Sequence, residues 1–232
     1  MKAVIMAAGK GTRMLPLTKT KPKVLIEVNK KPFLYYTLEH LKKAGITKVG
    51  LIVGHLKEKF PEFLGKHGFN ATLIEQKEQL GTGDAIMQVK NFIGDDNFIV
   101  IYGDNLFSAE DLKAIAKDDD LIYTGGFKVN NPEKYGVLIS DGDKLVEIKE
   151  KPKDFVGNLV NPGLYKLTPA IFAALEQIEK SPRGEYELTD AVSILAKQGK
   201  VKVVELNDYW LDLSSREDIP KIEDFLKKLG EQ

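Results

Sequence analysis

A glycine-rich segment near the N-terminus is the first candidate for chemistry. Residues 6–16 read Met-Ala-Ala-Gly-Lys-Gly-Thr-Arg-Met-Leu-Pro and follow a short apolar run. The residues with almost no side chain, which let backbone N–H groups approach an anion closely, are Ala7, Ala8, Gly9 and Gly11. Arg13 is an unusual choice in a chain whose cations are mostly lysines, and its planar guanidinium suits bidentate phosphate contact. The segment predicts a phosphate-binding loop, to which Lys23 adds charge; close helix packing is the alternative.

Two aspartates at the ends of apolar runs are candidate magnesium ligands. Asp104 follows the apolar residues 98–103, and the carboxyl ends of parallel strands converge on the ligand crevice of an α/β protein. A carboxylate there can hold Mg²⁺, which prefers oxygen ligands and phosphates, although Asp104-Asn105 also suits a simple turn. Asp212 stands among large apolar residues, where an acid is costly to bury unless it is paired or metal-bound. Strand alternation that points Asp212 to solvent is the other reading.

Glu150 and Lys151 end another predicted strand and offer an acceptor for hydroxyl groups and a cation for phosphate. In a chain this rich in lysine and glutamate, solvated surface charges are the alternative. The three histidines show no metal-ligand spacing, and we expect His40 and His67 on helix surfaces without a role. The run from Glu185 to Asp190 is expected to be a helix start with an acidic first turn.

Composition bounds the class of protein. The chain has 232 residues, 43% of them hydrophobic, and its 34 basic and 34 acidic residues cancel. It can therefore bury a sizeable core, while no global field recruits nucleic acid or a membrane. There is no cysteine, hence no disulfide or thiolate metal site, and no apolar run suits a signal peptide or a membrane span. These properties favour a cytoplasmic protein.

The first half alternates between apolar runs and amphipathic segments. The runs predict buried strands at residues 2–6, 48–53, 71–75 and 98–102, with an apolar stretch at 24–28. Helices are expected after Pro32 up to Gly45, at 57–67 with Pro61 disturbing it, and from the turn at 81–83 through Ile93. This repetition predicts a Rossmann-like, doubly wound, mainly parallel sheet covered by helices on both faces.

The second half predicts antiparallel additions to that sheet. Strands are expected at 121–129, 136–140, 144–149, 159–166 and 202–206, with a hairpin turn at 141–143. Helices are expected at 169–178, 188–197 and from about Ile219 to Leu229, the last with a Ser214/Glu217 capping box. Because no linker divides the chain, we predict a single domain over 1–232. Its C-terminal helix is expected over about 216–229.

Taken together, these segments resemble the sugar-phosphate nucleotidyltransferases, or nucleotide-sugar pyrophosphorylases, over nearly the whole chain. The strongest match is residues 7–13 with Pro16 and Lys21-Pro22-Lys23, which fit the family pattern A-G-x-G-T-R…P-K. Further matches follow in the family's order: Gln76, Leu80 to Ala85, Gly103-Asp104, Tyr135-Gly136, Glu150-Lys151-Pro152, Asn161 with Gly163, and Trp210 with Asp212. Two departures are Ser214-Ser215 in place of Gly-Thr, and Pro162 between Asn161 and Gly163.

The resemblance implies a nucleotide-binding part over about 1–105, a sugar-binding part over about 106–215, and a role for each matching residue. The expected nucleotide-binding residues are Ala7, Ala8, Gly9, Gly11, Thr12, Arg13, Gln76, Gly81, Thr82 and Asp104. Gln76 and the Gly81-Thr82 backbone would read a pyrimidine. The expected sugar-binding residues are Gly136, Glu150, Lys151 and Asn161, the catalytic cations Arg13, Lys23 and Lys151, and the Mg²⁺ ligands Asp104 and Asp212.

The implied reaction transfers a nucleoside monophosphate from UTP or dTTP to glucose 1-phosphate or N-acetylglucosamine 1-phosphate, releasing pyrophosphate. Three alternatives remain open: a catalytically silent nucleotide-sugar sensor on the same fold, a cytidylyltransferase acting on another phosphate and, more weakly, a dinucleotide-dependent oxidoreductase. No hexapeptide-type repeats follow the last helix, so we expect no acetyl transfer. Neither nucleic acid nor a membrane is an expected partner, and the prediction leaves homo-oligomers open.

Overall fold

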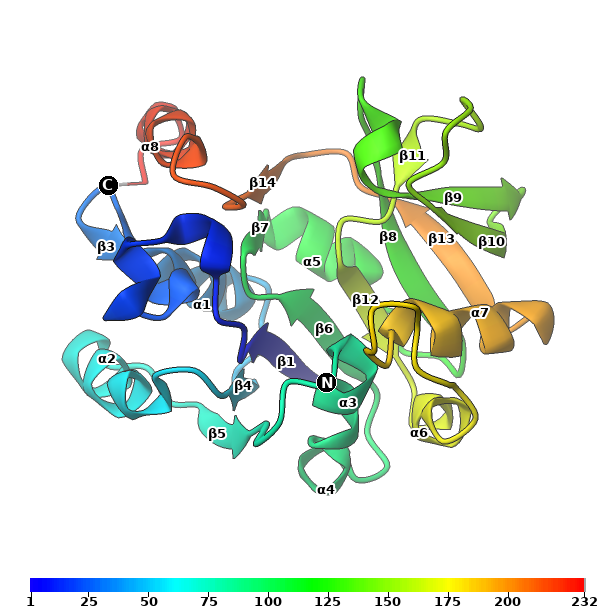
Figure 1. Cartoon of the computed structure of the whole chain (residues 1–232), viewed down its shortest axis with the longest axis horizontal. Helices are drawn as coiled ribbons and strands as arrows, with labels where there is room; N and C mark the ends of the chain where they lie inside the picture. The colour runs from blue at the N-terminus through cyan, green and yellow to red at the C-terminus, as the bar shows by residue number, and fades with distance from the viewer. Residues whose placement is uncertain (232) are drawn as a thin grey trace.

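A single large mixed sheet with helices on both faces organises the protein, as the computed structural model of residues 1–231 shows (Figure 1). The strand order is β11-β9-β10-β13-β8-β12-β6-β1-β4-β5. In that order, the strands are Leu159–Val160, Gly136–Asp141, Lys144–Glu150, Val201–Glu205, Ile122–Lys128, Leu164–Leu167, Phe98–Tyr102, Lys2–Ala7, Lys48–Val53 and Thr72–Glu75. The prediction of an α/β protein with helices on both faces is confirmed.

The half of the sheet built first along the chain is parallel. β1 pairs with β4 and β6 on its two sides, and β4 pairs with β5. Successive side chains of β1 alternate between two cores, so that Val4 belongs to one cluster and Ile5 to the other. A strand buried on both faces needs a continuous apolar run, which is why the sequence located β1, β4 and β6 within a residue.

The other half is mixed. β12 runs antiparallel to β6 and β8, whereas β13 is parallel to β8, and the hairpin β9–β10 joins through antiparallel pairing with β13. The antiparallel additions are thus where the sequence placed them, but the expectation of a mainly parallel sheet is wrong, because these additions make up half of a mixed sheet. The single strand expected over 159–166 is wrong: Asn161, Pro162 and Gly163 interrupt it and separate β11 from β12. Proline has no N–H to donate, and Gly163 has a φ of 82°, so the ladder stops there.

Helices cover the two faces in separate groups. One face carries α1 (Phe33–Lys43), α2 (Phe60–His67) and α5 (Ala109–Ile115). The other carries α3 (Thr82–Met87), α4 (Lys90–Ile93), α6 (Ala170–Leu175) and α7 (Leu188–Lys197). The last helix, α8 (Asp218–Lys228), packs through Ile222 and Leu226 into a third, smaller cluster with Met14 and Phe33. α5 was not predicted.

Two short ribbons lie outside the main sheet. β14 (Trp210–Asp212) pairs antiparallel with β7 (Asn105–Phe107), and β2 (Glu27–Val28) pairs with β3 (Lys31–Pro32). Neither ribbon was predicted, because each of the four strands has only two or three residues. In addition, β7 and β14 lie far apart along the chain. The first ribbon positions the candidate site.

Three expected helix boundaries differ in the structure. The helix expected from 82 to 93 is two helices, α3 and α4, separated at Gln88-Val89. The helix expected over 57–67 is a 3₁₀ turn at Lys57–Lys59 followed by α2, and Pro61 lies in the first turn of α2, where its missing N–H is not needed. The Ser214/Glu217 capping box expected for α8 is not formed: Glu217 precedes the helix without a side-chain capping bond, and Ser215 donates to the Asp218 carboxylate from its backbone N–H at 2.7 Å and its hydroxyl at 2.9 Å.

His40 is buried, which contradicts its expected place on a helix surface. Its exposed fraction is 1%, its Nδ1 lies 2.8 Å from the Phe107 carbonyl oxygen, and its Nε2 lies 2.8 Å from a Glu231 carboxylate oxygen. The α1 helix therefore anchors strand β7. Within residues 1–231, none of the helices combines the length and apolar character needed to cross a bilayer.

Candidate active site

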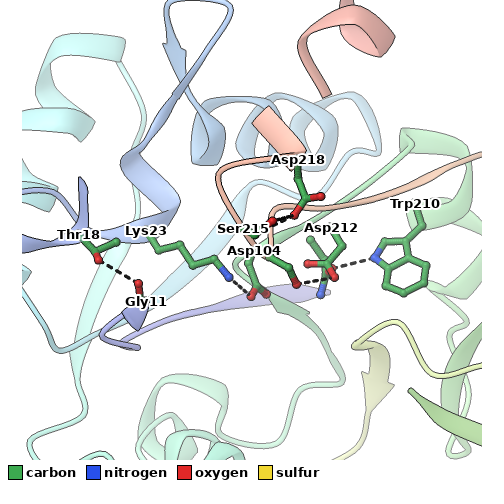
Figure 2. A network of polar contacts seen from close by, with 10 residues as sticks. Gly11, Thr18, Lys23, Asp104, Trp210, Asp212, Ser215 and Asp218 are labelled. Carbon is green, nitrogen blue, oxygen red and sulfur yellow. Dashed lines mark hydrogen bonds and ion pairs between the residues drawn. The ribbon is translucent and has the colours of Figure 1, made fainter. Parts of the chain in front are cut away.

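The glycine-rich segment leaves β1 and folds back on itself. Gly11 has a φ of 60°, in the left-handed region that favours glycine. A Cβ at Gly11 would lie 2.9 Å from the Thr18 methyl group and 3.0 Å from Cβ of Lys23, so that only glycine fits. The Thr18 hydroxyl closes the loop by donating to the Gly11 carbonyl oxygen at 2.9 Å (Figure 2). This fold brings Lys23 back beside the end of β1.

A cavity of about 300 Å³ lies where this loop meets the start of α3. The predicted residues that line it are Ala7, Ala8, Gly9, Gly11, Lys23, Gln76, Gly81, Thr82 and Asp104. Thr12 and Arg13 lie on the short 3₁₀ turn Thr12–Met14, and both are exposed outside the cavity lining. The lining residues that sequence reasoning missed are Met6, Val24, Gln79, Ala85, Tyr102 and Glu185.

Gln76 is a buried polar residue at this cavity, with an exposed fraction of 5%. Its Nε2 donates to the Gly81 carbonyl oxygen at 3.1 Å and to the Asp84 carboxylate at 2.7 Å. Both partners are acceptors only, so the amide group has one orientation and both of its hydrogens are used. The carbonyl oxygen Oε1 is the atom that Gln76 offers to a ligand.

A second segment packs against the turn before α3 and contributes to the cavity. The Gly83 N–H donates to the Tyr186 carbonyl oxygen at 2.8 Å, and the Tyr186 N–H donates to the Leu80 carbonyl oxygen at 2.7 Å. These bonds hold the neighbouring Glu185 at the cavity. The run from Glu185 to Asp190 does start a helix, since α7 begins at Leu188, but Glu185 also presents an acceptor for hydroxyl groups. No pattern in the sequence separates that glutamate from its neighbours.

Replacing Gly81 with alanine is expected to destabilise this corner of the cavity. Gly81 has a φ of 110°, and a Cβ there would lie 2.4 Å from the Tyr186 carbonyl oxygen, a backbone atom that cannot turn aside. We expect Gly81→Ala to lower the free energy of unfolding by roughly 2 kcal/mol, as backbone strain and steric overlap typically do. Urea unfolding measures it. Gly65→Ala is the control, because its Cβ meets no atom within 4 Å; equal stability of the two variants would contradict the expectation.

Asp104 and Asp212 lie together although the sequence separates them widely (Figure 2). Asp104 precedes β7, Asp212 ends β14, and the Leu213 N–H donates to the Asp104 carbonyl oxygen at 2.8 Å. The Trp210 indole N–H strengthens the ribbon by donating to the Asn105 side-chain oxygen at 2.8 Å. Lys23 Nζ lies 2.7 Å from the Asp104 carboxylate. The structure therefore brings both predicted metal ligands and one predicted catalytic cation to a single point.

The carboxylates of Asp104 and Asp212 repel one another, and this repulsion affects the pKa of Asp212. Burial and the neighbouring Asp104 carboxylate raise the pKa of Asp212 to about 6. A hydrogen bond from the Ser214 hydroxyl, at 2.8 Å, acts in the opposite direction and lowers this pKa. The serines that depart from the family pattern thus have local partners: Ser214 bonds to Asp212, and Ser215 bonds to Asp218. Two carboxylates that repel one another gain from a shared cation. The described residues contain no cluster of three or more acidic, histidine or cysteine ligands, and this two-carboxylate set fits Mg²⁺, which keeps water and phosphate oxygens as its other ligands.

The four predicted sugar-binding residues also come together, at the ends of β9, β10 and β11. Gly136 pairs with Glu150, and the Asn161 N–H donates to the Gly136 carbonyl oxygen at 2.8 Å. A Cβ on Gly136 would lie 3.1 Å from Oε2 of Glu150. The Lys151 N–H donates to the Tyr135 carbonyl oxygen at 3.0 Å, with Lys151 itself at a φ of 42°.

An aromatic contact connects this group to the carboxylate ribbon. The ring centroids of Tyr135 and Trp210 lie 5.2 Å apart in an edge-on arrangement, and Phe127 packs on the same indole at 5.9 Å. Burial, with a smaller contribution from the Asp212 charge, raises the pKa of Tyr135. The residues predicted to bind nucleotide, metal and sugar therefore form three adjoining groups. The Asp104 and Asp212 carboxylates lie between the glycine-rich loop and the predicted sugar-binding residues.

Comparison with known proteins shows the class of this protein. The chain belongs to the nucleotidyl transferase family, whose model matches residues 2–228. It is 41% identical over 220 residues to the bifunctional sugar-1-phosphate nucleotidylyltransferase/acetyltransferase of Sulfurisphaera tokodaii, covering 92% of this chain and 52% of that protein. It is 40% identical over 225 residues to the bifunctional protein GlmU of Methanococcus maripaludis, covering 94% of this chain and 53% of GlmU.

The fold is shared with solved structures. A UDP-glucose pyrophosphorylase in complex with UDP-glucose matches with a TM-score of 0.87 and 26% sequence identity, over 98% of both chains. The chain spans about half the length of the sequence relatives named above, so their complete activities belong to longer proteins.

Proposed function

We propose that the protein transfers uridylyl or thymidylyl groups from UTP or dTTP to a hexose 1-phosphate, giving a nucleotide-sugar and pyrophosphate. The observation that carries the proposal is the Lys23–Asp104 ion pair, at 2.7 Å, beside Asp212 and at the cavity formed by the glycine-rich loop. Glucose 1-phosphate and N-acetylglucosamine 1-phosphate are the proposed acceptors. Residues about 1–105 form the nucleotide-binding part of a Rossmann-like fold, and about 106–215 the sugar-binding part, within a single cytoplasmic domain.

Base recognition is assigned to Gln76 and the backbone of Gly81 and Thr82. Because Gln76 Nε2 is already bound to Gly81 and Asp84, Oε1 acts as an acceptor. Uracil and thymine carry a donor at N3, whereas cytosine carries an acceptor there. This arrangement favours UTP and dTTP over CTP, and it does not distinguish uracil from thymine.

The phosphate groups are assigned to the N–H groups of residues 7–13 and to the cations around them. Asp104 and Asp212 would hold Mg²⁺, which when bound neutralises phosphate oxygens and helps align them. Lys23 stabilises the Asp104 carboxylate and lies close enough to share in binding phosphate. Arg13, which is exposed on its 3₁₀ turn, would meet the outer phosphates of a nucleotide in the cavity.

The attacking group needs no general base. The second pKa of a phosphate monoester is about 6, so the sugar phosphate is largely deprotonated at neutral pH. The barrier comes from bringing two anions together and from charge that grows on the departing pyrophosphate. Lys151 positions the sugar phosphate, while Arg13 and Lys23 stabilise the leaving group. Glu150, Asn161 and the Gly136 backbone bind the sugar hydroxyl groups.

Replacing Arg13 with alanine should lower kcat/KM by roughly 10²- to 10³-fold, the effect of losing one preorganised charged donor. Arg13 is exposed, so the free energy of unfolding should stay the same. Arg13→Lys keeps the charge without the planar fork and should retain more activity than Arg13→Ala. Steady-state rates of pyrophosphate release provide the measurement, and near-normal turnover of Arg13→Ala would refute the assignment.

A matrix of nucleotides against sugar 1-phosphates tests the proposed function as a whole. UTP, dTTP, CTP, ATP and GTP are each combined with glucose 1-phosphate or N-acetylglucosamine 1-phosphate, and pyrophosphate release is followed in the presence of Mg²⁺. We expect release with UTP or dTTP. Nucleotide binding without release would instead indicate a silent sensor, and release with CTP alone would indicate a cytidylyltransferase.

A further inference from the structure

A buried tyrosine, Tyr165, contacts the side chain of Asn161, the proposed sugar-binding asparagine. Tyr165 on β12 has an exposed fraction of 0%, and its hydroxyl accepts a hydrogen bond from Asn161 Nδ2. At its other end, the Asn161 side-chain oxygen accepts from the Gly163 N–H at 3.0 Å. The Gly163 N–H selects the orientation of the Asn161 amide, because only the side-chain oxygen can accept from it, and the NH₂ group is then held by the Tyr165 hydroxyl.

A second tyrosine connects this contact to the nucleotide cavity. Tyr102 ends β6 and lines the cavity, and its hydroxyl interacts with the side chains of Thr82 and Tyr165. Its ring packs against Gly163, where a Cβ would lie only 2.7 Å from the ring. Thr82 is itself fixed, since its Oγ1 accepts from the Leu188 N–H at 2.9 Å. Neighbouring polar side chains therefore extend from Thr82, past both tyrosines, to Asn161.

The hydroxyl of Tyr165 is not needed to fill the core. Its ring is already enclosed by apolar neighbours of the larger core cluster, and a phenylalanine ring would occupy the same space. Burial raises the pKa of Tyr165 to about 12, so the hydroxyl stays neutral over the usual assay range and is unsuited to proton transfer. What it supplies is an acceptor at a fixed place.

We propose that Tyr165 is a positioning residue that orients Asn161 for the sugar of the acceptor, and that Tyr102 ties this orientation to Thr82 at the nucleotide end. The inference rests on the proposed function, because it requires Asn161 to contact the sugar. Tyr165 touches neither substrate. Without its hydroxyl, the Asn161 amide keeps only the contact with the Gly163 N–H and is held less firmly, so the sugar must restrict it further on binding.

The test is Tyr165→Phe in the full chain, with whichever of glucose 1-phosphate and N-acetylglucosamine 1-phosphate the wild type turns over. The KM for the sugar 1-phosphate should rise roughly 5- to 30-fold, the worth of one orienting hydrogen bond. The KM for the nucleotide and kcat should both stay within about threefold, because the remaining contacts of Asn161 can re-form in the bound complex. A sugar 1-phosphate KM within twofold of the wild type overturns the proposal.

Two further variants distinguish a role of Tyr165 in orienting Asn161 from a general loss of stability. Tyr123→Phe removes another buried tyrosine hydroxyl, which donates to the Asp119 carboxylate at 2.6 Å away from the cavity lining, and it should leave both KM values unchanged. In an Asn161→Ala background, Tyr165→Phe should add no further increase in the sugar KM. Additive effects, or an equal rise in both KM values, overturn the proposal. If the wild type turns over no sugar 1-phosphate, the proposed function itself fails, and that result precedes any comparison of variants.

Discussion

Asp104→Ala is expected to abolish Mg²⁺-dependent turnover while leaving the fold intact. Asp104 supplies one of only two carboxylates at the proposed metal site and is the ion-pair partner of Lys23 at 2.7 Å. Its loss removes several kcal/mol of charge stabilisation, or about 10³- to 10⁴-fold in kcat/KM. The carboxylate is about one-third exposed, and the main sheet does not depend on its side chain. A Mg²⁺ titration of the initial rate of pyrophosphate release measures the effect.

The matched control for Asp104→Ala is Asp143→Ala. Asp143 also forms an ion pair with a lysine, Lys202, at 2.7 Å, but it lies on the exposed β9–β10 hairpin. Its loss should change neither the rate nor its dependence on Mg²⁺. Circular dichroism and thermal unfolding verify that both variants fold. Unchanged activation of Asp104→Ala by Mg²⁺ would disprove the metal assignment.

Asp212→Asn is expected to stabilise the metal-free protein and at the same time to remove its activity. Burial and the Asp104 charge raise the pKa of Asp212 from 3.8 to about 6, so the folded state prefers its protonated form. Above about pH 6 the folded protein must hold the charged form, which costs on the order of 1–3 kcal/mol. Asparagine removes that cost. It also weakens the proposed metal site, with an expected loss of turnover of about 10³-fold.

The stabilising effect of Asp212→Asn on the free energy of unfolding should depend on pH. Between pH 3.8 and about 6 the folded state binds more protons than the unfolded state, so the contribution of Asp212 to stability falls as pH rises. The stability gain of Asp212→Asn should therefore be full at pH 8 and vanish toward pH 4. Urea unfolding in buffer with a chelator measures both ends. A gain that is equal at both pH values, or a loss at pH 8, would contradict it.

Asp218 provides a contrasting control six residues further on. Although burial opposes the shift, hydrogen bonds from the Ser215 backbone and hydroxyl lower the pKa of Asp218. The charged form is the favoured one, so its stabilising contribution is present above the unfolded pKa and is lost on acidification. Asp218→Asn should thus destabilise the protein at pH 8, whereas Asp212→Asn stabilises it. The two variants make the same chemical change with opposite expected signs.

The sequence predicted well those elements that local pattern alone determines. Continuous apolar runs located β1, β4 and β6, and a strong apolar periodicity located α7 over Leu188–Lys197. It failed where pairing partners lie far apart or residues are few. The ribbon of β7 and β14 depends on tertiary contacts, which periodicity does not record. The break at Pro162 has a local cause, but the apolar residues on both sides of it gave the pattern of one continuous strand.

In the candidate site, too, the residues that belong to local sequence motifs were predicted and those brought in by tertiary contacts were not. The glycine-rich loop, Gln76 and Asp104 line the cavity as the motifs indicated. Gln79, Tyr102 and Glu185 were not predicted, because nothing in their types or spacing distinguishes them from other polar and aromatic residues of the chain. Gln79 illustrates the reason: its Nε2 donates to the Ala8 carbonyl oxygen at 2.7 Å, a contact between residues 71 positions apart. Their roles come from proximity, which only the fold supplies.

The ribbon of β7 and β14 has a consequence for how the protein is made. The hydrogen bond from Trp210 to Asn105 joins residues that are 105 positions apart, and Asp212 follows Trp210 on the same strand. A chain that emerges from the ribosome acquires its phosphate loop first and Asp104 soon afterwards, but it gains its second carboxylate only near the end of residues 1–231. A partly synthesised chain therefore lacks the complete carboxylate pair, and the proposed Mg²⁺ site can form only after the strands of the proposed sugar-binding part have been added.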